Sequence, residues 1–260
     1  MRPLTRGGRA VTYSKVGLMV LREHFQQRKI EATFGSFRSL VPLNTPSGPQ
    51  ETESELESEL LEQLAFAPGV YDLFTQPIIE YVVNGKKRTY TPDMVVQLHA
   101  SGDFTCDRYI IEVKRRADLI ANASAYAMKF EAARRAADHL GAAFRIMDDS
   151  LIRTPYLRNA RLLSHHLEAD PEMVSVDILE DAIGFAPIGV ADAIALLKRE
   201  GVEEPDARAS IEQCVAWRRL TCNLSLEFND RSTINVRNLG VLPHRHDDPL
   251  LRFLDGAPSA

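Results

Sequence analysis

Residues Tyr109-Ile110-Ile111-Glu112-Val113-Lys114 decide the fold, because they combine a strand pattern with two charges. Side chains of a strand alternate between its two faces, so Ile110, Glu112 and Lys114 share one face. An acid and an amine are costly to bury on a sheet face unless they interact with something. The stretch therefore predicts a central strand that carries a functional carboxylate and a functional ammonium group.

A second predicted strand supplies a partner for the first. Tyr90-Thr91-Pro92-Asp93-Met94-Val95-Val96 has its proline near the start, where strands tolerate it, and a polar stretch at residues 100–103 predicts a hairpin loop. Pairing of the two strands brings Asp93 near Glu112. The pattern Pro-Asp, then Glu-Val-Lys, resembles the P-D…(D/E)-x-K core of metal-dependent nucleases. The alternative is a structural ion pair between Glu112 and Lys114 at a sheet edge.

The composition is that of an ordinary soluble globular chain. It has 260 residues, 45% hydrophobic and 26% charged, enough for one large domain or for a domain of about 150 residues with a smaller one. No apolar run is long enough to span a membrane, and the N-terminus lacks the apolar part of a secretory signal. The cysteines, Cys106, Cys214 and Cys222, are scattered, which predicts neither disulfides nor a zinc site and favours a reducing cytoplasm.

Charge is unevenly distributed along the chain. The net charge is −5, yet residues 1–50 hold eight Lys and Arg against two Glu. An acidic protein binds DNA poorly by itself, so a DNA substrate would require partner proteins and bound cations. The basic N-terminal segment, in which Lys15 to Gln27 predicts a short helix, is either a DNA-facing element or a solvated arm.

Glu51 to Phe66 predicts an amphipathic helix. At helical spacing its leucines form one apolar face, and Glu55, Glu59 and Glu62 lie on the opposite face, where a solvated role suffices. Glu57 falls among the leucines instead. We therefore interpret Glu57 as an inward-facing functional carboxylate.

Alternating strands and helices follow in an order typical of a mixed sheet. Ile78–Val83 and Lys86–Tyr90 form a predicted hairpin around Asn84-Gly85, a strong turn signal. After the two motif strands come a predicted helix, Ala117 to Leu140, and a last strand, Ala143 to Met147. This order predicts an α/β or α+β fold, with a mixed sheet flanked by helices.

Together the motifs resemble those of the TnsA family, the endonuclease subunit of heteromeric cut-and-paste transposases. The resemblance covers about residues 35–150. It is carried by Glu53-Ser54-Glu55-Leu56-Glu57, by Gln76-Pro77 with Tyr90-Thr91-Pro92-Asp93, and by Glu112-Val113-Lys114.

The resemblance implies a fold, an activity and partners. The fold is similar to that of type II restriction endonucleases. The subunit cleaves the 5′ strand at the ends of a transposon, while a TnsB-like transposase processes the 3′ strand and a TnsC-like AAA+ regulator contacts the C-terminal domain. By motif position the catalytic residues are Glu57, Asp93, Glu112 and Lys114, and the three acids hold Mg²⁺, for which Mn²⁺ may substitute. Hard oxygen ligands suit this metal.

Several polar side chains near these motifs are candidate contacts to double-stranded DNA. Arg115 and Arg116 follow the motif lysine and either hold phosphates or form a helix-start surface. The basic residues at the hairpin tip, Lys86, Lys87 and Arg88, either contact DNA or increase solubility. Gln76, which precedes the hairpin, either orients a ligand or DNA or belongs to a turn that enters the strand.

The C-terminal part divides from the rest by composition. We expect four regions: a basic segment (1–50), the nuclease core (51–150), a winged-helix-like domain (151–240) and a tail (241–260). Predicted helices precede a strand, Cys222 to Phe228, and a return strand, Thr233 to Val236, which is typical of a winged helix.

The predicted recognition helix, Gly189 to Glu200, has basic residues only at its far end, so a protein partner is favoured over DNA. Apolar residues within Pro249–Leu254 suggest a further hook for a partner.

Two rival functions remain open. A self-sufficient restriction or repair nuclease would cleave DNA without partners, which the acidic charge disfavours. A non-catalytic adaptor between transposase and regulator would not need Lys114, which the complete set of acids and lysine disfavours.

Overall fold

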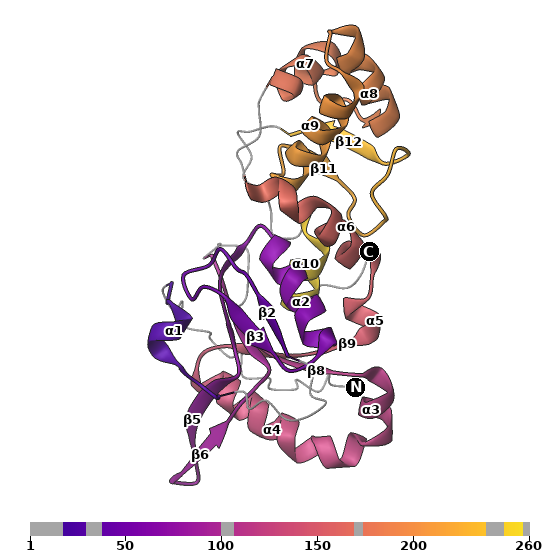
Figure 1. Cartoon of the computed structure of the whole chain (residues 1–260). Coiled ribbons are helices and arrows are strands. Elements are labelled where there is room, and N and C mark those ends of the chain that lie inside the picture. The colour runs from indigo at the N-terminus through magenta and orange to yellow at the C-terminus, as the bar shows by residue number, and fades with distance from the viewer. Residues whose placement is uncertain (1–17, 30–37, 100–106, 169–173, 238–246, 257–260) are drawn as a thin grey trace, which may run out of the picture.

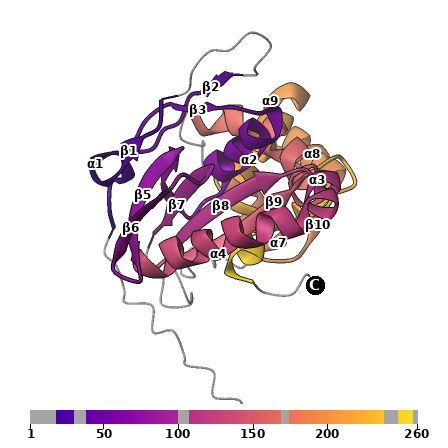
Figure 2. The ribbon, with the colours of Figure 1, turned by 90° about the horizontal axis from the view of Figure 1, so that it is seen from below.

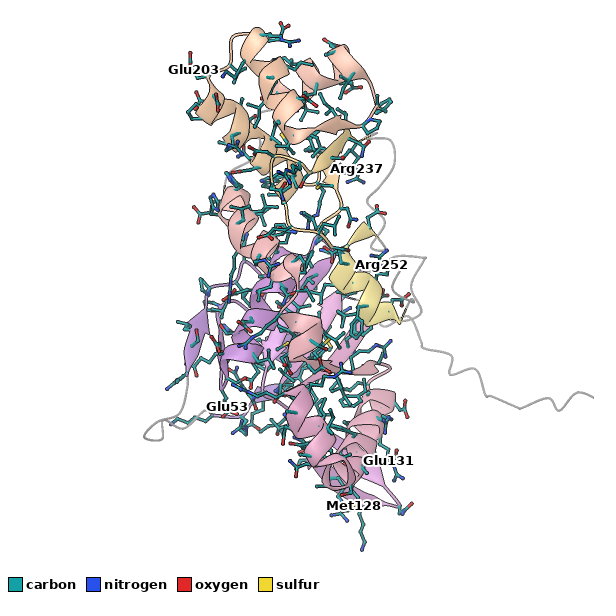
Figure 3. The ribbon with its side chains drawn as sticks, turned by 90° about the vertical axis from the view of Figure 1, so that its right-hand side faces the viewer. Glu53, Met128, Glu131, Glu203, Arg237 and Arg252 are labelled. Carbon is teal, nitrogen blue, oxygen red and sulfur yellow. The ribbon has the colours of Figure 1, made fainter. Side chains whose placement is uncertain are left out.

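The computed structural model describes residues 18–29, 38–99, 107–168, 174–237 and 247–256. These residues form a sheet lobe (residues 18–148) and a helical lobe (residues 149–237), stacked end to end with the last helix between them (Figure 1). Figure 3 shows Met128 and Glu131 at the far end of the sheet lobe and Glu203 at the far end of the helical lobe. Half of the basic N-terminal segment (residues 1–17 and 30–37) and the predicted loop at residues 100–103 lie outside the described residues. Within the described ranges, no helix has the length and apolar character needed to cross a membrane.

The sheet lobe is built on a four-stranded mixed sheet in the order β4-β7-β8-β9. β4 and β7 are antiparallel, as are β7 and β8, whereas β8 and β9 are parallel. The β7–β8 register pairs Met94 with Ile111, so the two predicted motif strands are direct neighbours. The predicted mixed sheet is confirmed. The strands are Val70–Thr75 (β4), Met94–Leu98 (β7), Arg108–Lys114 (β8) and Ala143–Asp148 (β9).

Each face of this sheet packs on a different helix. Tyr109, Ile111 and Val113 join one apolar cluster with the leucines of α2 (Glu55–Phe66). Ile110 joins a second cluster with alanines of α4 (Ala123–His139), which lies across the strands in Figure 2. The alternation predicted for β8 is therefore confirmed, and Glu112 and Lys114 belong to the face that α4 covers.

Two predicted helices have different boundaries from those expected. The first begins at Glu55 because the preceding residues, Gln50–Thr52, form β3, which pairs with β2 (Ser39–Val41). The predicted helix over residues 117–140 is two helices, α3 (Arg116–Ala121) and α4. The break falls at Asn122, whose φ of −119° and ψ of 25° leave the helical region and whose side-chain amide donates to Asp118 Oδ1 at 2.6 Å.

The predicted hairpin is confirmed as β5 and β6, which project from the lobe (Figure 1). Asn84 and Gly85 adopt φ of 51° and 72° in its turn, the left-handed backbone that these residues tolerate best. The predicted helix over residues 15–27 is helical in its described part only over Leu21–His24, because Gln26 and Gln27 pair with β5 instead. The elements are α1 (Leu21–His24), β1 (Gln26–Gln27), β5 (Pro77–Val83) and β6 (Lys86–Tyr90).

From residue 174 on, the helical lobe has a helix–strand–helix–helix–strand–strand order and a three-stranded sheet, β10-β12-β11. This order is compatible with the winged-helix prediction, which stays a prediction. In a winged helix the recognition helix directly precedes the β-hairpin. Here that helix is α9, whereas the segment considered from the sequence forms α8. The first turn of α9 contains acidic residues. The elements are α5 (Asp149–Ile152), α6 (Pro155–Leu163), η1 (Ser164–Glu168), α7 (Val174–Ile183), β10 (Ile188–Gly189), α8 (Val190–Arg199), α9 (Glu204–Ala216), β11 (Leu220–Cys222) and β12 (Thr233–Val236).

The strand predicted from Cys222 to Phe228 is wrong beyond its first residue. The buried Asn159 side chain of α6 donates to the carbonyl oxygens of Leu224 and Leu226 and accepts from the Phe228 amide. This side chain satisfies the backbone groups that a strand would have paired, so the segment runs as a loop over α6.

Charged side chains join the lobes along α2 and α6. Glu59, predicted to be solvated, is 6% exposed and accepts from Arg153 Nε at 2.7 Å. Glu62 pairs with Arg161 at 2.7 Å. The acidic face of α2 is therefore an ion-pair surface between the lobes, because Arg153 at the end of α5 and Arg161 of α6 face it.

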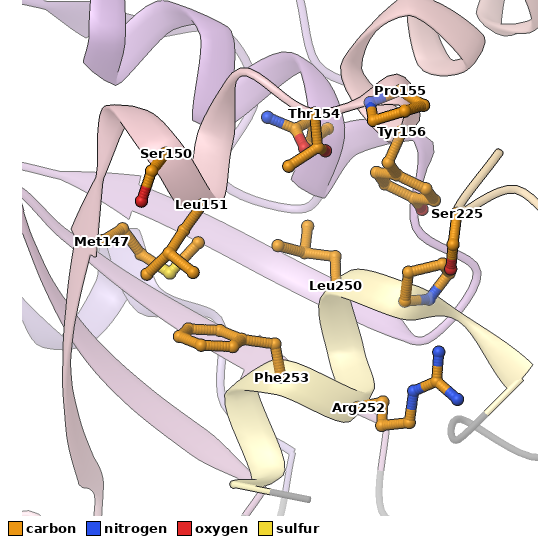
Figure 4. A pocket seen from close by; sticks show the side chains of 12 residues that line it. Met147, Ser150, Leu151, Thr154, Pro155, Tyr156, Ser225, Leu250, Arg252 and Phe253 are labelled. Carbon is orange, nitrogen blue, oxygen red and sulfur yellow. The ribbon is translucent and has the colours of Figure 1, made fainter. Parts of the chain in front are cut away.

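The last helix, α10 (Pro249–Asp255), uses its apolar residues within the chain. Leu250, Leu251 and Leu254 are buried in the main core, which contradicts the expected partner hook. Leu250 and Phe253 of α10 also line a pocket of about 300 Å³ against the sheet lobe and α6 (Figure 4).

Candidate active site

The Glu112 carboxylate is fully buried in the middle of the site, where three donors bind it. Its Oε2 accepts from the Tyr90 hydroxyl at 2.6 Å. Its Oε1 lies 2.8 Å from Lys114 Nζ and 2.5 Å from Lys129 Nζ. These donors come from β6, β8 and α4, so the strand face predicted to carry charge has partners from three elements.

Asp93 lies just before β7, beside the end of β8. Its Oδ2 accepts from the Val113 amide at 2.6 Å and from Lys114 Nζ at 3.3 Å. Lys114 Nζ also donates to the Val113 carbonyl oxygen at 2.7 Å. The antiparallel pairing of β7 and β8 therefore joins Asp93, Glu112 and Lys114 through one ammonium group.

Charge and burial perturb the pKa of each of these groups. Burial, reinforced by the negative charge of Glu112, raises the pKa of Asp93 to about 7. Burial opposes ionisation of Glu112, but the charge and hydrogen bonds of Lys114, with those of Lys129 and Tyr90, outweigh it and lower its pKa. Two carboxylates thus share a confined space, and the proton goes to Asp93.

Lys114 is a cation in this arrangement. Burial disfavours its ammonium form, but the charges of Asp93 and Glu112 outweigh burial and raise its pKa. A divalent cation beside Lys114 would oppose this effect, because like charge disfavours the ammonium form. Without such a cation the carboxylates dominate, so Lys114 donates hydrogen bonds and does not accept protons.

Glu57 faces inward from the first turn of α2, as predicted, but it also caps that helix. Ser54 is the N-cap, its Oγ accepts from the Glu57 amide at 3.2 Å, and it donates to Glu57 Oε1 at 2.8 Å. Glu57 Oε2 accepts from the Glu53 amide at 2.9 Å. Burial raises the pKa of Glu57, and the Lys114 charge partly opposes this. Ser54-x-x-Glu57 is a capping-box sequence, a structural role that the sequence argument missed.

The donor set suits a hard divalent cation. Asp93, Glu112 and Glu57 offer carboxylate oxygens, and the repulsion that raises the Asp93 pKa is what a bound cation would relieve. Within the described residues, however, no three acid, histidine or cysteine side chains converge on one point as metal ligands. The carboxylate oxygens are therefore suitable ligands for Mg²⁺. In this structure, however, the Glu112 oxygens accept hydrogen bonds from two lysine ammonium groups and the Tyr90 hydroxyl.

The candidate DNA contacts fall into two groups by exposure. Lys86, Lys87 and Arg88 are exposed on the projecting hairpin and form no ion pair within the described part of the chain. Arg115 is exposed beside the site. Arg116 is also exposed, but its backbone amide donates to Asp149 and its guanidinium to Ser150.

Gln76 differs from the other candidates because it is only 2% exposed, which argues against the predicted direct DNA contact. It adopts φ of 50°, and its Oε1 accepts from Arg28 Nη2 at 2.6 Å. Arg28 also pairs with Glu53 at 2.5 Å. Gln76 and Glu53 therefore orient an arginine next to the first turn of α2.

Sequence reasoning missed Tyr90, Lys129 and Arg28. Tyr90 directly precedes Thr91-Pro92-Asp93, so its position beside the motif could have indicated that it belongs to the site. Lys129 lies one helical turn before the buried Ala133 of α4, a spacing that places both on the sheet-facing side. No local pattern marked Arg28, because its partners are distant in sequence.

The strand order, the helix on each face and the cluster of acids with a lysine define a nuclease core of the restriction-endonuclease type. Residues 67–149 match the family model described as the TnsA-like endonuclease N-terminal domain. The matched segment contains Asp93, Glu112 and Lys114, and it ends at the start of α5. This match confirms the predicted resemblance to the TnsA family over the matched segment and supports a transposase-associated nuclease in general. A search of curated proteins found no match to the chain.

Proposed function

We propose that the chain is the divalent-metal-dependent DNA endonuclease subunit of a heteromeric transposase. In this role it cleaves the 5′ strand at transposon ends by phosphodiester hydrolysis, leaving a 5′-phosphate and a 3′-hydroxyl. The observation that carries the proposal is the cluster of Asp93, Glu112 and Lys114 inside the segment that matches the TnsA-like endonuclease domain.

Asp93 and Glu112 are the residues that would hold Mg²⁺, and Glu57 is a third candidate. Bound there, the metal would stabilise negative charge on the phosphate oxygens and activate water. Tyr90 and Val113 keep the two carboxylates in place through hydrogen bonds of 2.6 Å each. The role of the backbone and the tyrosine is therefore to orient oxygens that would otherwise repel one another.

Lys114 supplies positive charge at the reacting phosphate. Its ammonium group contacts Asp93 and Glu112, and its side chain is 20% exposed, so it reaches the edge of the site. A protonated lysine stabilises charge that develops on phosphate oxygens. We therefore assign Lys114 an electrostatic role at the phosphate.

The DNA would approach along the hairpin and α4. A groove of about 660 Å³ between them is lined by Arg88 of β6 and by Met128, Arg135 and its ion-pair partner Glu131 of α4. Exposed hairpin lysines extend this basic edge. Phosphate contacts of this kind give affinity without sequence reading, which suits a subunit whose partners select the DNA.

Partner proteins complete the proposal. Helix α9 of the helical lobe has Glu204 and Asp206 in its first turn. Acidic residues at this position disfavour DNA binding. We therefore assign this lobe to contacts with a TnsC-like AAA+ regulator, and the strand transfer chemistry to a TnsB-like transposase. The chain itself would act in the bacterial cytoplasm.

The test is cleavage of DNA that carries transposon ends, with Mg²⁺, in the presence and absence of a TnsB-like transposase. We expect 5′-strand cleavage at the ends that needs the partner and disappears in Lys114→Met. Specific cleavage by the chain alone would support the self-sufficient nuclease. Undiminished transposition with Lys114→Met would support the adaptor.

A further inference from the structure

Two ammonium groups bind the same oxygen of Glu112. Lys129 Nζ lies 2.5 Å and Lys114 Nζ 2.8 Å from Oε1, while the Tyr90 hydroxyl takes Oε2. The motif lysine is one of the two, and the other comes from the middle of α4, outside every motif. The catalytic proposal does not need this second lysine, so its position calls for a separate explanation.

The two lysines differ in how firmly they are held. Lys114 is 20% exposed and also binds Asp93 Oδ2 and the Val113 carbonyl oxygen. The Lys129 side chain is 41% exposed, and within the described part of the chain its ammonium group donates to Glu112. A lysine side chain on a helix surface has many rotamers, so Lys129 can leave Glu112 with the smaller loss of contacts.

A divalent cation at Glu112 conflicts with this arrangement. Two ammonium groups and a dication around one carboxylate would repel each other strongly in a buried site. Asp93 and Glu112 both contact Lys114 Nζ, so their carboxylates lie close together. Once one ammonium group moves away, Asp93 can therefore serve as a second ligand to a cation at Glu112. Lys129, the more exposed and less bonded of the two, is the group that must move.

Resting on the proposed function, we propose that Lys129 is a positioning residue that occupies Glu112 until a divalent cation displaces it, and that its ammonium group then binds a DNA phosphate. Its neighbour Met128 already lines the groove between α4 and the hairpin. Metal binding and DNA binding are thereby coupled, because Lys129 is free to bind a phosphate only after the metal has displaced it from the carboxylate.

The first test is Mn²⁺ binding by calorimetry to the full chain without DNA. We expect Lys129→Met to tighten Mn²⁺ binding roughly 5- to 10-fold, because a competing positive charge is removed. Lys129→Arg, which keeps the charge, should bind Mn²⁺ within about twofold of wild type. Arg134→Met is the matched control, since it removes one exposed cation from the same helix, and it should change the affinity by less than about twofold.

The second test measures binding to duplex DNA with Ca²⁺ and without divalent cation. With Ca²⁺, Lys129→Met should lose several-fold in affinity and lower the salt slope by about one. Without the cation the variant should match wild type, because Lys129 is then engaged by Glu112. Thermal melting of each variant verifies that it is folded.

Unchanged or weaker Mn²⁺ binding by Lys129→Met would overturn this inference, since a merely structural lysine would give that result. Asp93→Asn separates this failure from failure of the proposed function. If Asp93→Asn loses the metal but Lys129→Met does not gain affinity, only the role of Lys129 is wrong. If Asp93→Asn binds Mn²⁺ like wild type, the metal site itself is wrong.

Discussion

Two buried carboxylates in this chain have similar immediate partners and different surroundings. Glu112 in the sheet lobe accepts from the Tyr90 hydroxyl and binds lysines. Asp248, which caps α10 between the lobes, accepts from the Tyr156 hydroxyl and lies 3.5 Å from Arg218. Each acid is at most 2% exposed in its side chain, so burial alone does not distinguish them.

The difference lies in the balance of charge around each acid. Burial raises the pKa of Asp248 as well, but its charged neighbour is a cation, Arg218, and the Leu250 and Leu251 amides donate to it. Glu112 has Asp93 nearby, with its pKa raised to about 7 by burial and by that neighbour. Like charges that a fold leaves close together indicate a functional site, whereas a satisfied buried ion pair indicates structure. The predictions below test this distinction, from the largest expected effect to the smallest.

Replacing Asp93 should separate activity from stability. Asp93→Asn should reduce strand cleavage in the assembled system at least about 1,000-fold, because a metal ligand is lost. The free energy of unfolding should stay the same or rise, because a repulsive buried charge is removed. End-labelled DNA cleavage and urea unfolding measure the two quantities. A strongly destabilised variant would mean that Asp93 is a structural acid like Asp248.

Replacing Asp248 should give the opposite pattern. Asp248→Asn should lower the free energy of unfolding by about 3 kcal/mol, because it leaves Arg218 buried without its counterion. Mn²⁺ affinity of the folded protein should not change. Urea unfolding and calorimetry provide the comparison, with the exposed Asp181→Asn as control. Loss of metal binding at full stability would contradict the distinction between the two acids.

Glu57 tests whether an acid can have both roles. Glu57→Gln keeps a side chain that can cap α2 but removes the charge, so stability should hold while cleavage falls roughly 10- to 100-fold. Glu57→Ala should lose cleavage and also about 1 kcal/mol of stability. Equal cleavage by wild type and Glu57→Gln would leave Glu57 with the capping role alone.

The pH dependence of metal binding should report Asp93. Its pKa of about 7 means that Asp93 carries a proton below that pH, and the metal must displace it. Mn²⁺ affinity should therefore fall as the pH decreases below about 7, approaching tenfold per pH unit, and level off above it. Glu112, with its lowered pKa, stays ionised over this range. Calorimetry from pH 5.5 to pH 8.5 measures the profile, and a flat profile would show that Asp93 binds no metal.

The sequence predicts the parts of the site that depend on local pattern. Alternation along residues 109–114 put Glu112 and Lys114 on one face, and the Pro-Asp turn brought Asp93 beside them, because strand pairing carries nearby motifs together. Helical spacing also placed Glu57 inward. Its capping role was readable from Ser54 but was overlooked.

The rest depends on contacts that no local pattern encodes. Lys129 and Arg28 meet the site through tertiary packing, and the Asn159 side chain turns a strand-like alternation into a loop. The apolar residues of α10 were interpreted as a binding site for a partner, because the sequence alone does not show that this helix packs into the core of the same chain.

The most direct test of the central claim is anomalous diffraction from crystals of the full chain soaked with Mn²⁺. The account predicts a manganese peak bonded to carboxylate oxygens of Asp93 and Glu112, with the Lys129 ammonium group moved away from Glu112. A manganese peak elsewhere, with Lys129 still on Glu112, would contradict it.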